Sequence, residues 1–574
     1  MRQMVSTITT EGTRFRDRHG RHVILRGVNL GGDCKVPTTP DGHSYHRTDF
    51  ADHRTASFVG RPFLLAEADA HFARLKRLGF NCLRLLTTWE AVEHAGPGQY
   101  DEAYLDYFTA IAKRAGDFGL HVIIDFHQDV WARMSGGDGA PGWTFEAAGL
   151  DFTKFDAADA AHVMAYRYDA GRGGRQDSYP QMSWGANYRM PANAIMWTLF
   201  FAERRGLLRG PAWSPLDALA VASGLTRTLP LLEGGERVVN AAGVSIWRND
   251  VTDPFRDAAV WDVDASGVAI AIADDHFATL DGHPVDHGRD FMAPFYARVA
   301  DTVRAVRDDW LIFAEADPFG GHGLPDCPPR TVNASHWYDL ATLVTKRFTP
   351  WESRDLLTGQ LYEGRVAVVG HYTAGLQRIA DIGDSLGSGA PTLIGEFGIP
   401  FDLNDGEAYR RWTDGERGPD LWAAHHAALS AMYDALDALL LSSTQWNYTA
   451  SNANDPMVGD GWNQEDLSIW SQDQVDDPTD PDAGARALDG FCRPYVRAAQ
   501  GRVLEQSWTN GIFRCVIDAD LSITAPTIVF VPAHWQVAAT ETEDQVAFDA
   551  AHNQLVVHHK ATGHRHLRVD LKRR

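Results

Sequence analysis

The feature that most constrains the fold is an alternation of short apolar runs with segments of helical periodicity. The apolar run 23–30 is followed by helical spacing over 64–78, where apolar residues recur every three or four positions, and then by the run 81–88. A helical segment over 102–118 leads into the run 121–127. Later apolar runs cover 310–315, 332–338, 392–397 and 440–448, and a helical segment over 421–439 precedes the last. Because parallel strands need long crossovers and are buried on both faces, the alternation predicts a parallel sheet covered by helices.

Polar and aromatic residues gather where nearly every predicted strand ends. They are Asn29, Arg84, His127, Gln128, Asp129, Glu315, His336, Trp337, Tyr338, Glu396, Gln445, Trp446 and Asn447. In a (β/α)₈ barrel the carboxyl ends of all strands meet at one mouth, where the active site lies. No G-x-G-x-x-G or Walker sequence directly follows a predicted strand, so an open nucleotide-binding sheet has no support. The sequence therefore predicts an α/β fold of the (β/α)₈ TIM-barrel type, and we expect no cofactor.

The end of the chain changes character. From about residue 495 the helical period disappears, and short β-rich runs at 511–517, 527–531 and 554–558 are separated by turn residues. This pattern predicts a small antiparallel β-sandwich, so we divide the chain into a barrel over 1–494 and a sandwich over 495–574. We interpret the sandwich as a stabilising module, with lipid or sugar contact as the alternative. The irregular, glycine- and proline-rich stretch 132–310 is typical of lids or binding loops.

The charge of the chain excludes several classes of partner. The 53 Lys and Arg residues against 76 Asp and Glu give a net charge of −23, which argues against nucleic acid and against an anionic membrane surface. No run approaches the roughly 18 apolar residues of a transmembrane helix, so we expect none. The first 26 residues lack the apolar segment of a signal peptide, and the five scattered cysteines suit a reducing compartment. A cytoplasmic location is therefore expected.

Glu396 is the first catalytic candidate because it directly follows the apolar run 391–395. A buried charge is unfavourable unless it is paired or functional. Glu396 is thus either a salt-bridged glutamate at the barrel rim or a nucleophilic or acid/base carboxylate. Arg84 at the end of the second strand can keep such a carboxylate ionised, and His336 and Tyr338 can hydrogen-bond to it.

The sequence His127-Gln128-Asp129 allows two interpretations. His and Asp at this spacing occur in metal sites, but no second cluster with clear ligand spacing follows, so we expect no metal. Amide, carboxylate and imidazole groups next to tryptophans suit a sugar, which presents hydroxyl rims and apolar C–H faces. We therefore expect a carbohydrate or glycolipid as the substrate.

A set of ordered motifs carries a family resemblance. The motifs are Arg26–Gly32, Asn81–Arg84, His127–Trp131, Ser135–Trp143, His336–Tyr338, Ile394–Gly398 and Trp446–Tyr448. With these motifs the chain resembles glycoside hydrolase family 5, whose members are retaining (β/α)₈ glycosidases. It looks most like the branch of endoglycoceramidases and of steryl and ceramide β-glucosidases, which the predicted C-terminal sandwich also fits.

The resemblance implies roles for the residues at the strand ends. Glu396 corresponds to the nucleophile after strand seven, and Arg84 to the strand-two arginine beside it. Residues of the sugar-binding −1 subsite correspond to His127, His336, Tyr338 and Trp446, and we add their polar neighbours Gln128, Asp129 and Asn447 as substrate-binding candidates. The implied reaction has two steps: Glu396 attacks the anomeric carbon while a second carboxyl group protonates the leaving oxygen, and water then releases the sugar with retention.

The chain departs from the family pattern at the acid/base residue. The family uses the glutamate of an Asn-Glu-Pro motif after strand four, and no Asn-Glu dipeptide occurs here. The segment 194–201 resembles the part that precedes helix three, and 210–217 resembles the part that follows strand four. We therefore expect the barrel to lack one helix and one strand near residue 205. Three explanations can account for this departure. The segment with the acid/base glutamate is missing from this sequence, the protein is a catalytically impaired relative, or another carboxylate takes the place of that glutamate.

Two glutamates are candidates for that substitute. Glu315 follows the predicted strand 310–315, and Glu203 follows the apolar run 194–201, which can itself serve as strand four. The leading hypothesis is a retaining β-glycosidase that acts on β-glucosides with a hydrophobic aglycone, such as a glycolipid, steryl or aryl glucoside. The alternative is a carbohydrate-binding pseudoenzyme without an acid/base residue. A purely structural scaffold is disfavoured, because a scaffold does not need so many polar groups at one mouth.

Overall fold

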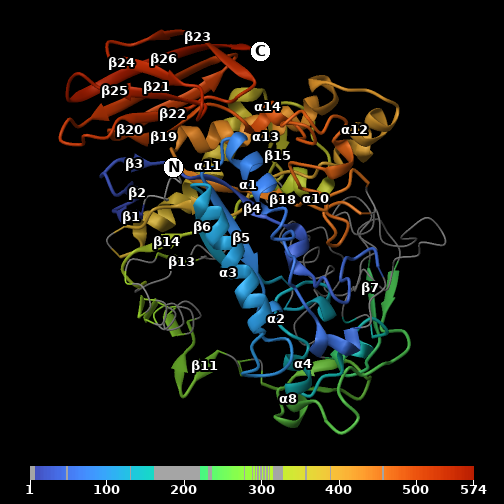
Figure 1. Ribbon diagram of the computed structural model, residues 1–574. Coiled ribbons are helices and arrows are strands. Elements are labelled where there is room, and N and C mark those ends of the chain that lie inside the picture. Colours follow the sequence, from blue (N-terminus) through green and yellow to red (C-terminus); the bar gives the residue numbers. More distant parts are fainter. Residues whose placement is uncertain are drawn as a thin grey trace.

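Seven short parallel strands form the inner layer of the larger part of the molecule (Figure 1). In spatial order they are β13 (Ile312–Ala314), β14 (Thr331–Asn333), β17 (Leu393–Ile394), β18 (Ser442–Tyr448), β4 (Arg26–Leu30), β5 (Cys82–Thr87) and β6 (His121–Phe126). A parallel bridge between Asn333 and Thr392 connects the pair β13–β14 to the five other strands. The order is that of a (β/α)₈ barrel in which one position, between β6 and β13, is not described.

The computed structural model describes residues 7–46, 50–160, 220–314 and 327–574, apart from short gaps within these ranges. The candidate acid/base residues Glu203 and Glu315 and the segments 194–201 and 210–217 lie outside the described residues. Within the described ranges, no strand pairs with the outer edge of β6. On the outer face of β6, the side chains of Ile124 and Phe126 are 51% and 71% exposed. Residues 161–219, where the shortage near residue 205 is expected, lie outside the described residues, so that expectation stays a prediction.

The helices of the described ranges are α1 (Ala68–Arg77), α2 (Trp89–Glu93), α3 (Glu102–Asp117), α4 (Trp143–Ala147), α8 (Pro254–Asp257), α10 (Leu340–Thr345), α11 (Arg365–Ser385), α12 (Leu403–Thr413), α13 (Ala423–Ala438) and α14 (Leu488–Phe491). Among them α3 and α11 pack against barrel strands, whereas α4 and α8 lie at the end of the molecule away from the sandwich (Figure 1). Local sequence explains several helix ends. The Asp101 side chain accepts a hydrogen bond from the Tyr104 N–H and caps α3. Gly79 has a φ of 97° just after α1, a backbone conformation that glycine adopts without strain.

Two antiparallel sheets form the predicted sandwich. One sheet contains β20 (Gly501–Thr509), β21 (Ile512–Ala519), β26 (Gly563–Arg573) and β23 (Trp535–Glu541). The other contains β1 (Ile8–Glu11), β2 (Arg14–Asp17), β3 (His22–Val23), β19 (Tyr495–Ala499), β22 (Thr527–Phe530), β25 (Gln554–His558) and β24 (Gln545–Asp549). The predicted runs 511–517, 527–531 and 554–558 correspond to β21, β22 and β25.

Strands from both ends of the chain form the sandwich. Our division places residues 8–23 with the barrel, whereas the structure pairs β3 with β19, with Val23 opposite Ala498. The first three strands therefore extend the C-terminal sheet and then continue into β4 of the barrel. The pattern of the sequence did not indicate this pairing, because antiparallel partners almost 500 residues apart leave no local signal.

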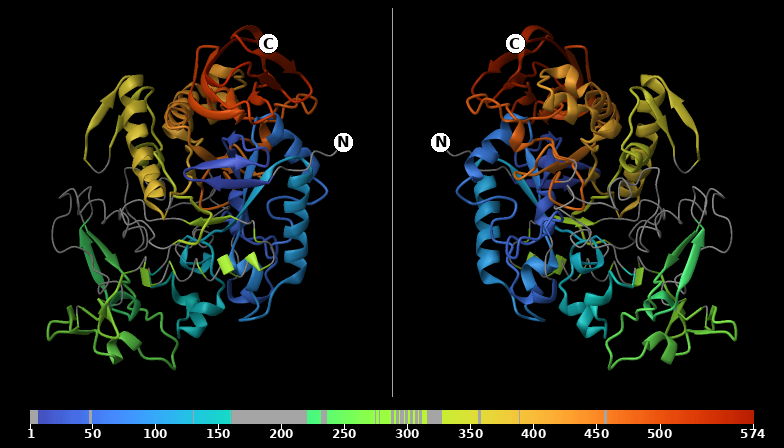
Figure 2. Two further views of the ribbon diagram at one scale, coloured as in Figure 1. Left: turned by 90° about the vertical axis from the view of Figure 1, so that its left-hand side faces the viewer. Right: turned by 90° about the vertical axis from the view of Figure 1, so that its right-hand side faces the viewer.

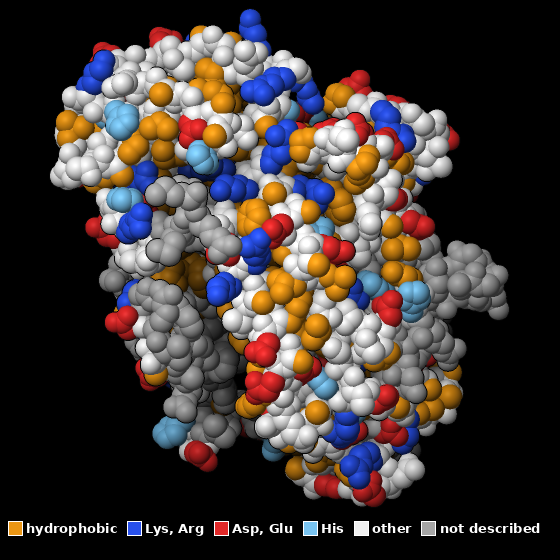
Figure 3. All heavy atoms as spheres, in the orientation of Figure 1, with side chains coloured by type: hydrophobic (Ala, Val, Ile, Leu, Met, Phe, Trp, Pro, Cys, Tyr) orange, Lys and Arg blue, Asp and Glu red, His pale blue; other side chains and the backbone are white. Residues whose placement is uncertain are grey.

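The sandwich packs against the amino ends of the barrel strands. The Ile24 N–H donates to the Arg497 carbonyl, and the Tyr495 hydroxyl donates to the Gly79 carbonyl at 2.9 Å. One continuous apolar core runs from the barrel, with Leu85 and Phe397, into the sandwich, with Phe513. On the face of the molecule drawn in Figure 3, Lys and Arg side chains gather along the border between the barrel and the sandwich.

Small hairpins lie at the end of the molecule away from the sandwich (Figures 1 and 2). They pair β7 (Arg227–Pro230) with β8 (Glu236–Val239), β9 (Trp261–Val263) with β10 (Ala269–Ala271), and β11 (Thr279–Leu280) with β12 (His283–Pro284). A further hairpin, β15 (Glu352–Arg354) with β16 (Leu361–Glu363), precedes α11. None of the helices in the described part of the chain combines the length and apolar character that crossing a bilayer requires.

Candidate active site

Glu396 lies at the carboxyl end of β17, where its side chain is surrounded by polar groups from neighbouring strands. The residue is only 7% exposed. Arg84 donates to its Oε1 at 2.5 Å, and the Tyr338 hydroxyl donates to its Oε2 at 3.0 Å. The His336 Nδ1 lies 3.5 Å from Oε2. We call these four residues the mouth cluster; it contains the contacts of Glu396 with Arg84, His336 and Tyr338 that the sequence predicted.

Gly395 allows the strands to approach closely enough for this cluster. A Cβ atom at Gly395 would lie 2.5 Å from the Ala334 carbonyl oxygen and 3.1 Å from the ring of His336. Any larger residue would therefore push the segment after β14 away from β17, and with it the side chains that contact Glu396. The glycine that precedes Glu396 in the sequence thus has a packing role at the site.

Arg84 connects the carboxylates of the mouth. Besides Glu396, its guanidinium contacts Asp125 Oδ1 on β6 at 2.9 Å and Asn29 Oδ1 on β4 at 2.7 Å. Burial raises the pKa of Glu396, but the charges of His336, Arg84, His127 and Lys35 together lower it more, so the pKa lies below its ordinary value. Glu396 is therefore an ionised carboxylate near neutral pH, as an attacking nucleophile must be.

His127 follows β6 and stands beside this cluster. Its ring stacks on Trp446 with the centroids 5.5 Å apart, and its Nδ1 lies 3.8 Å from Glu396 Oε1. Burial and the charge of Lys35 lower the pKa of His127, but surrounding carboxylates, which include Asp125, outweigh them and raise it to about 10. A protonated His127 is a hydrogen-bond donor at both ring nitrogens.

A second charged group adjoins His127. Asp129 Oδ2 accepts from the Lys35 Nζ at 3.0 Å and lies 3.2 Å from the His127 Nε2. The backbones of Asp129 and Asp138 form an antiparallel bridge, which brings the Asp138 carboxylate to 3.7 Å from the Lys35 Nζ. The Lys35 ammonium also lies over the rings of Trp446 and Trp462, at 4.7 and 3.7 Å from their centroids.

These contacts bear on the metal interpretation of His127 and Asp129. Ligand atoms of His127, Asp129 and Asp138 lie close enough together to hold an ion. Lys35, however, already contacts both aspartates with its ammonium group. Its positive charge occupies the place a cation would take, so the arrangement suits sugar hydroxyls better than a metal ion.

Two of the predicted substrate-binding residues stand apart from the mouth cluster. Gln128 is exposed and packs beside Gly139, because successive residues after β6 point to opposite sides. The amide of Asn447 is fully buried and donates to Asp460 Oδ2 at 2.9 Å, while its oxygen accepts from Thr449. Asn447 therefore orients the loop after β18. The roles of these two residues, and of Trp446 beside His127, stay predictions.

Sequence reasoning missed several residues that the structure brings to the mouth: Lys35, Asp125, Asp138, Trp462 and Glu465. Asp125 carried a usable signal, because it precedes His127 by two positions and strand residues two apart share a face. Lys35 lies five residues beyond β4 and carried no such signal. It reaches the site only because the short helical turn Gly32–Lys35 folds back over the barrel.

Two further carboxyl groups near the mouth have raised pKa values. Burial is the main cause for both Asp138 and Glu465, and the charge of Glu396 contributes, so that each has a pKa of about 7. The pKa of Asp460, the partner of Asn447, is also raised, by burial and by the charge of Glu465. The mouth therefore contains carboxylates kept ionised, namely Glu396, Asp125 and Asp129, and others whose raised pKa values lead them to bind protons more readily.

Exposed aromatic rings extend from this site. Trp131, in the loop after β6, is 47% exposed, and Trp89, at the start of α2, is 38% exposed. Their centroids lie 6.4 Å apart, and Trp89 makes an edge contact with Trp143 at 5.4 Å. A buried ion pair between Glu90 and Arg133, at 2.7 Å, fixes the loop that carries these rings. The rim thus presents an apolar surface next to a polar centre.

Known proteins resemble the chain in both sequence and structure. A model described as Cellulase (glycosyl hydrolase family 5) matches residues 41–168. The glucosylceramidase of Rhizopus delemar is 30% identical, over 92% of this chain and 89% of its own. The ergosteryl-beta-glucosidase of Saccharomyces cerevisiae is 27% identical, over 81% of this chain and 75% of its own. The crystal structure of Cryptococcus neoformans sterylglucosidase 1 with tris superposes with a TM-score of 0.83 at 25% identity, covering 100% of this chain and 99% of that one.

Proposed function

The chain belongs to glycosyl hydrolase family 5, and on that premise we propose that it is a retaining β-glucosidase whose substrates carry a hydrophobic aglycone. It is a glycoside hydrolase, and its relatives are named glucosylceramidase and ergosteryl-beta-glucosidase. These names support a glycolipid or a steryl glucoside as the substrate class. They give no support to the pseudoenzyme alternative.

The observation that carries the proposal is the environment of Glu396. A buried carboxylate that receives hydrogen bonds from Arg84 and Tyr338 is ionised and fixed in position. In the proposed first step a Glu396 oxygen bonds to the anomeric carbon, and the bond from that carbon to the aglycone oxygen breaks. A carboxylic acid gives its proton to the departing oxygen.

The second step regenerates the enzyme. Water attacks the glucosyl ester at the anomeric carbon, and the same acid/base group, now a carboxylate, takes the proton of the water. The ester bond to Glu396 breaks, and two inversions together give net retention. We propose Glu315 as this acid/base group, with Glu203 as the alternative; both lie outside the described residues.

The groups around His127 support the placement of the sugar. Protonated His127 and Lys35 can donate to sugar hydroxyls, while the Asp129 carboxylate can accept from them. The buried Trp446 ring stacks on His127 and so holds this imidazole in position for the sugar. Trp89 and Trp131 at the rim can contact an apolar aglycone, which supports the hydrophobic substrate class.

The proposal is tested by following hydrolysis of an aryl β-glucoside by proton NMR. The first sugar released should be the β-anomer, which mutarotation then converts to the equilibrium mixture. Glucosylceramide and a steryl glucoside should also be cleaved, and an aryl α-glucoside serves as the control. Release of the α-anomer would contradict the retaining mechanism, and sugar binding in a calorimeter without any turnover would favour the pseudoenzyme.

The acid/base assignment has its own test. Glu315→Gln should lower turnover of a substrate with a poor leaving group by about 10²–10⁴-fold, the range of general acid catalysis. A dinitrophenyl glucoside should be affected less, since its leaving group needs no proton, and azide should restore turnover and yield β-glucosyl azide. Unchanged activity of Glu315→Gln would reject Glu315, and Glu203→Gln would then be measured in the same way.

A further inference from the structure

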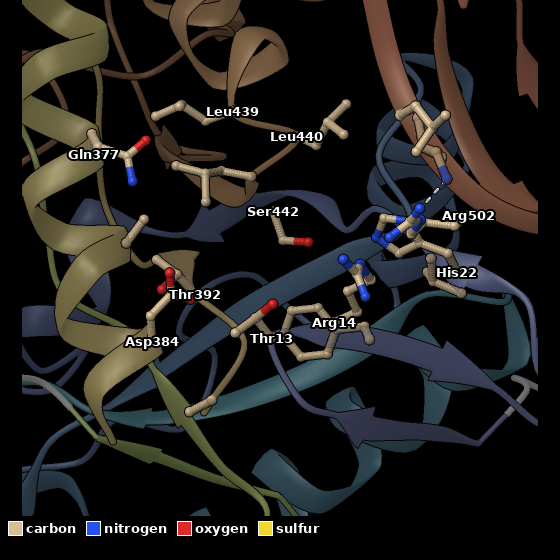
Figure 4. A pocket seen from close by; sticks show the side chains of 17 residues that line it. Thr13, Arg14, His22, Gln377, Asp384, Thr392, Leu439, Leu440, Ser442 and Arg502 are labelled. Carbon is tan, nitrogen blue, oxygen red and sulfur yellow. Dashed lines mark hydrogen bonds between the residues drawn. The ribbon is translucent and has the colours of Figure 1, made fainter. Parts of the chain in front are cut away.

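A polar cavity lies at the opposite end of the barrel from the mouth, and Figure 4 shows the side chains that line it. Its volume is about 350 Å³, and its walls come from β2, β3, α11, β20, the segment 439–441 and the first residue of β18. Thr392 and Ser442 stand at the start of β17 and β18, whereas the site lies at the ends of these strands. Because β18 has seven residues, about 20 Å separate the two ends. We call this space the seam cavity, because the barrel and the sandwich meet around it.

One end of the seam cavity is positively charged. Figure 4 shows Arg14 of β2, His22 of β3 and Arg502 of β20 close together on one side. Within the described part of the chain, no carboxylate forms an ion pair with Arg14. Arg502 has one partner, Asp518, at 3.3 Å, and both of these side chains are about 40% exposed, at 43% and 38%. The second-largest influence on the pKa of Arg14, after burial, is repulsion by Arg502, and both lower it.

Two neutral groups at the same end have protons to donate. Burial and the nearby arginines lower the pKa of His22 to about 3, so its ring is neutral. Its Nδ1 accepts the Val503 N–H at 3.2 Å, which places the ring proton on Nε2. The Ser442 oxygen accepts the Leu25 N–H at 3.0 Å, so its own hydrogen is available as a donor. The end formed by Arg14, Arg502, His22 and Ser442 is thus rich in donors.

The other end of the cavity differs in character. Gln377, Asp384 and Thr392 lie there, and Leu439 and Leu440 line the side between (Figure 4). Asp384 is the acidic residue among those lining the cavity, and it is exposed. An anion would therefore be attracted to the arginine end and repelled from the Asp384 end, which defines a single position for it.

We propose that the seam cavity binds an oxyanion of the phosphate class between Arg14 and Arg502. Guanidinium groups match phosphate oxygens in shape and charge, and an anion here would relieve the repulsion between the two arginines. The volume of about 350 Å³ is at the small end of ligand sites, which run from about 300 to 1,000 Å³. The phosphate can be free inorganic phosphate or the phosphate group of a lipid.

Binding at this position would join three parts of the molecule. Arg14 and His22 belong to the N-terminal strands, Arg502 to the C-terminal sandwich and Ser442 to the barrel. A ligand that contacts all three binds the folded protein only, so it must raise the stability of the docked arrangement. Glu396 is not among the residues that line the cavity, so the test of this proposal does not depend on the proposed glucosidase activity.

The first experiment is calorimetric titration of the full chain with inorganic phosphate, with sodium chloride used to keep the ionic strength constant. We expect saturable binding at one site and a thermal midpoint that rises with phosphate concentration. Loss of one charge-assisted contact in Arg14→Gln or Arg502→Gln should weaken binding at least about tenfold. Arg18→Gln is the matched control, because Arg18 lies on the same N-terminal hairpin, is exposed and does not line the cavity.

The variants distinguish binding in the seam cavity from binding of phosphate elsewhere on the protein. Equal phosphate affinity in wild type and Arg14→Gln would overturn the proposal, as would equal weakening in Arg18→Gln. Because Arg14 and Arg502 lie on different strands, the second variant keeps the test valid if the first does not fold, and circular dichroism checks both. Glu396→Gln should bind phosphate like wild type, so failure of the proposed glucosidase function would leave this test unaffected.

A second arm identifies the source of the phosphate. Phosphatidylcholine vesicles with and without phosphatidic acid are sedimented with the protein. Binding that needs phosphatidic acid and is lost in Arg14→Gln would support a lipid phosphate at the seam cavity. If Arg14→Gln still sediments with these vesicles, another surface binds them; and if neither inorganic phosphate nor these vesicles bind saturably, the proposal fails.

Discussion

Arginines lie at both ends of the barrel, but their surroundings differ. At the mouth, Arg84 contacts the carboxylates of Glu396 and Asp125. At the seam cavity, Arg14 and Arg502 face each other, and among the described residues the one carboxylate that forms an ion pair with either is the half-exposed Asp518. At the mouth the buried Arg84 guanidinium thus helps to keep the carboxylates of Glu396 and Asp125 ionised. Guanidinium groups without such a partner leave a positive field that an external anion can neutralise.

A third arginine, at the amino end of the barrel, has a structural role. Arg26 at the start of β4 forms a buried ion pair with Asp437 at the end of α13. Asp437 is also contacted by Arg493 at 3.2 Å and by the Gln506 amide of the sandwich at 2.7 Å. This group connects barrel, helix and sandwich, and no part of it borders the mouth.

Among the substitutions considered, the largest loss of activity is expected for a residue of the mouth. Glu396→Gln removes the attacking oxygen without changing the size of the side chain, so hydrolysis of aryl β-glucosides should fall on the order of 10⁴-fold or more. Steady-state rates and the thermal midpoint are the measurements. Glu363→Gln, an exposed glutamate on β16, is the control and should change neither. An active Glu396→Gln enzyme would remove the basis for treating the mouth as catalytic.

For the ion pair of Arg26 with Asp437 we expect the opposite pattern: a loss of stability without a loss of activity. Asp437→Asn leaves Arg26 buried without its carboxylate, so the free energy of unfolding should fall by about 3–5 kcal/mol. The activity of each folded molecule should stay near that of wild type, because the group lies at the amino end of the barrel. Denaturant unfolding and active-site titration separate these quantities. A loss of activity per folded molecule without a loss of stability would mean that the two ends are coupled.

Arg84 should affect activity through the protonation of Glu396. In Arg84→Met the positive charge that lowers the pKa of Glu396 is gone, so this pKa rises and the acidic limb of the kcat/KM profile moves to higher pH. The maximal rate should fall on the order of 10²-fold, as for loss of one preorganised donor. Arg84→Lys keeps the charge and should leave the acidic limb nearer its original position. An unmoved acidic limb in Arg84→Met would show that Arg84 only positions Glu396.

The smallest effect is expected at the aromatic rim. Trp131→Ala removes one exposed ring, worth about 0.5–1.5 kcal/mol of aromatic contact, so KM for glucosylceramide or a steryl glucoside should rise by roughly 2- to 12-fold. The kcat for a small aryl glucoside should not change. Phe548→Ala, an exposed aromatic residue on β24, is the control. Equal effects on lipid and aryl substrates would place Trp131 outside the aglycone contact.

Much of the barrel could be predicted because its signals are local. The helix expected over 102–118 is α3, Glu102–Asp117, and the strand expected over 440–448 contains β18, Ser442–Tyr448. The helix α11, Arg365–Ser385, was missed, because Gly370, Gly375 and Gly383 interrupt its apolar pattern and lower its helix propensity. At Gly375 a Cβ would lie 2.5 Å from the Trp337 ring, so the glycine serves packing that no local pattern reveals.

The sequence by itself assigned Glu396, Arg84, His127, His336 and Tyr338 to strand ends, which made them candidates, and the resemblance led to a glycosidase. Glu396 and His127 do follow β17 and β6, whereas Arg84 lies in the interior of β5, Cys82–Thr87. Periodicity and the residue types at strand ends are properties of short segments, so they can be recognised in the sequence without knowledge of the tertiary structure. Only the tertiary structure decided that Lys35 and Asp138 join His127, that residues 8–23 belong to the C-terminal sheet, and that Arg14 faces Arg502. Each of these depends on chain segments that are distant in sequence and meet only when the core closes, and burial then sets which charges are paired and which are left to bind a ligand.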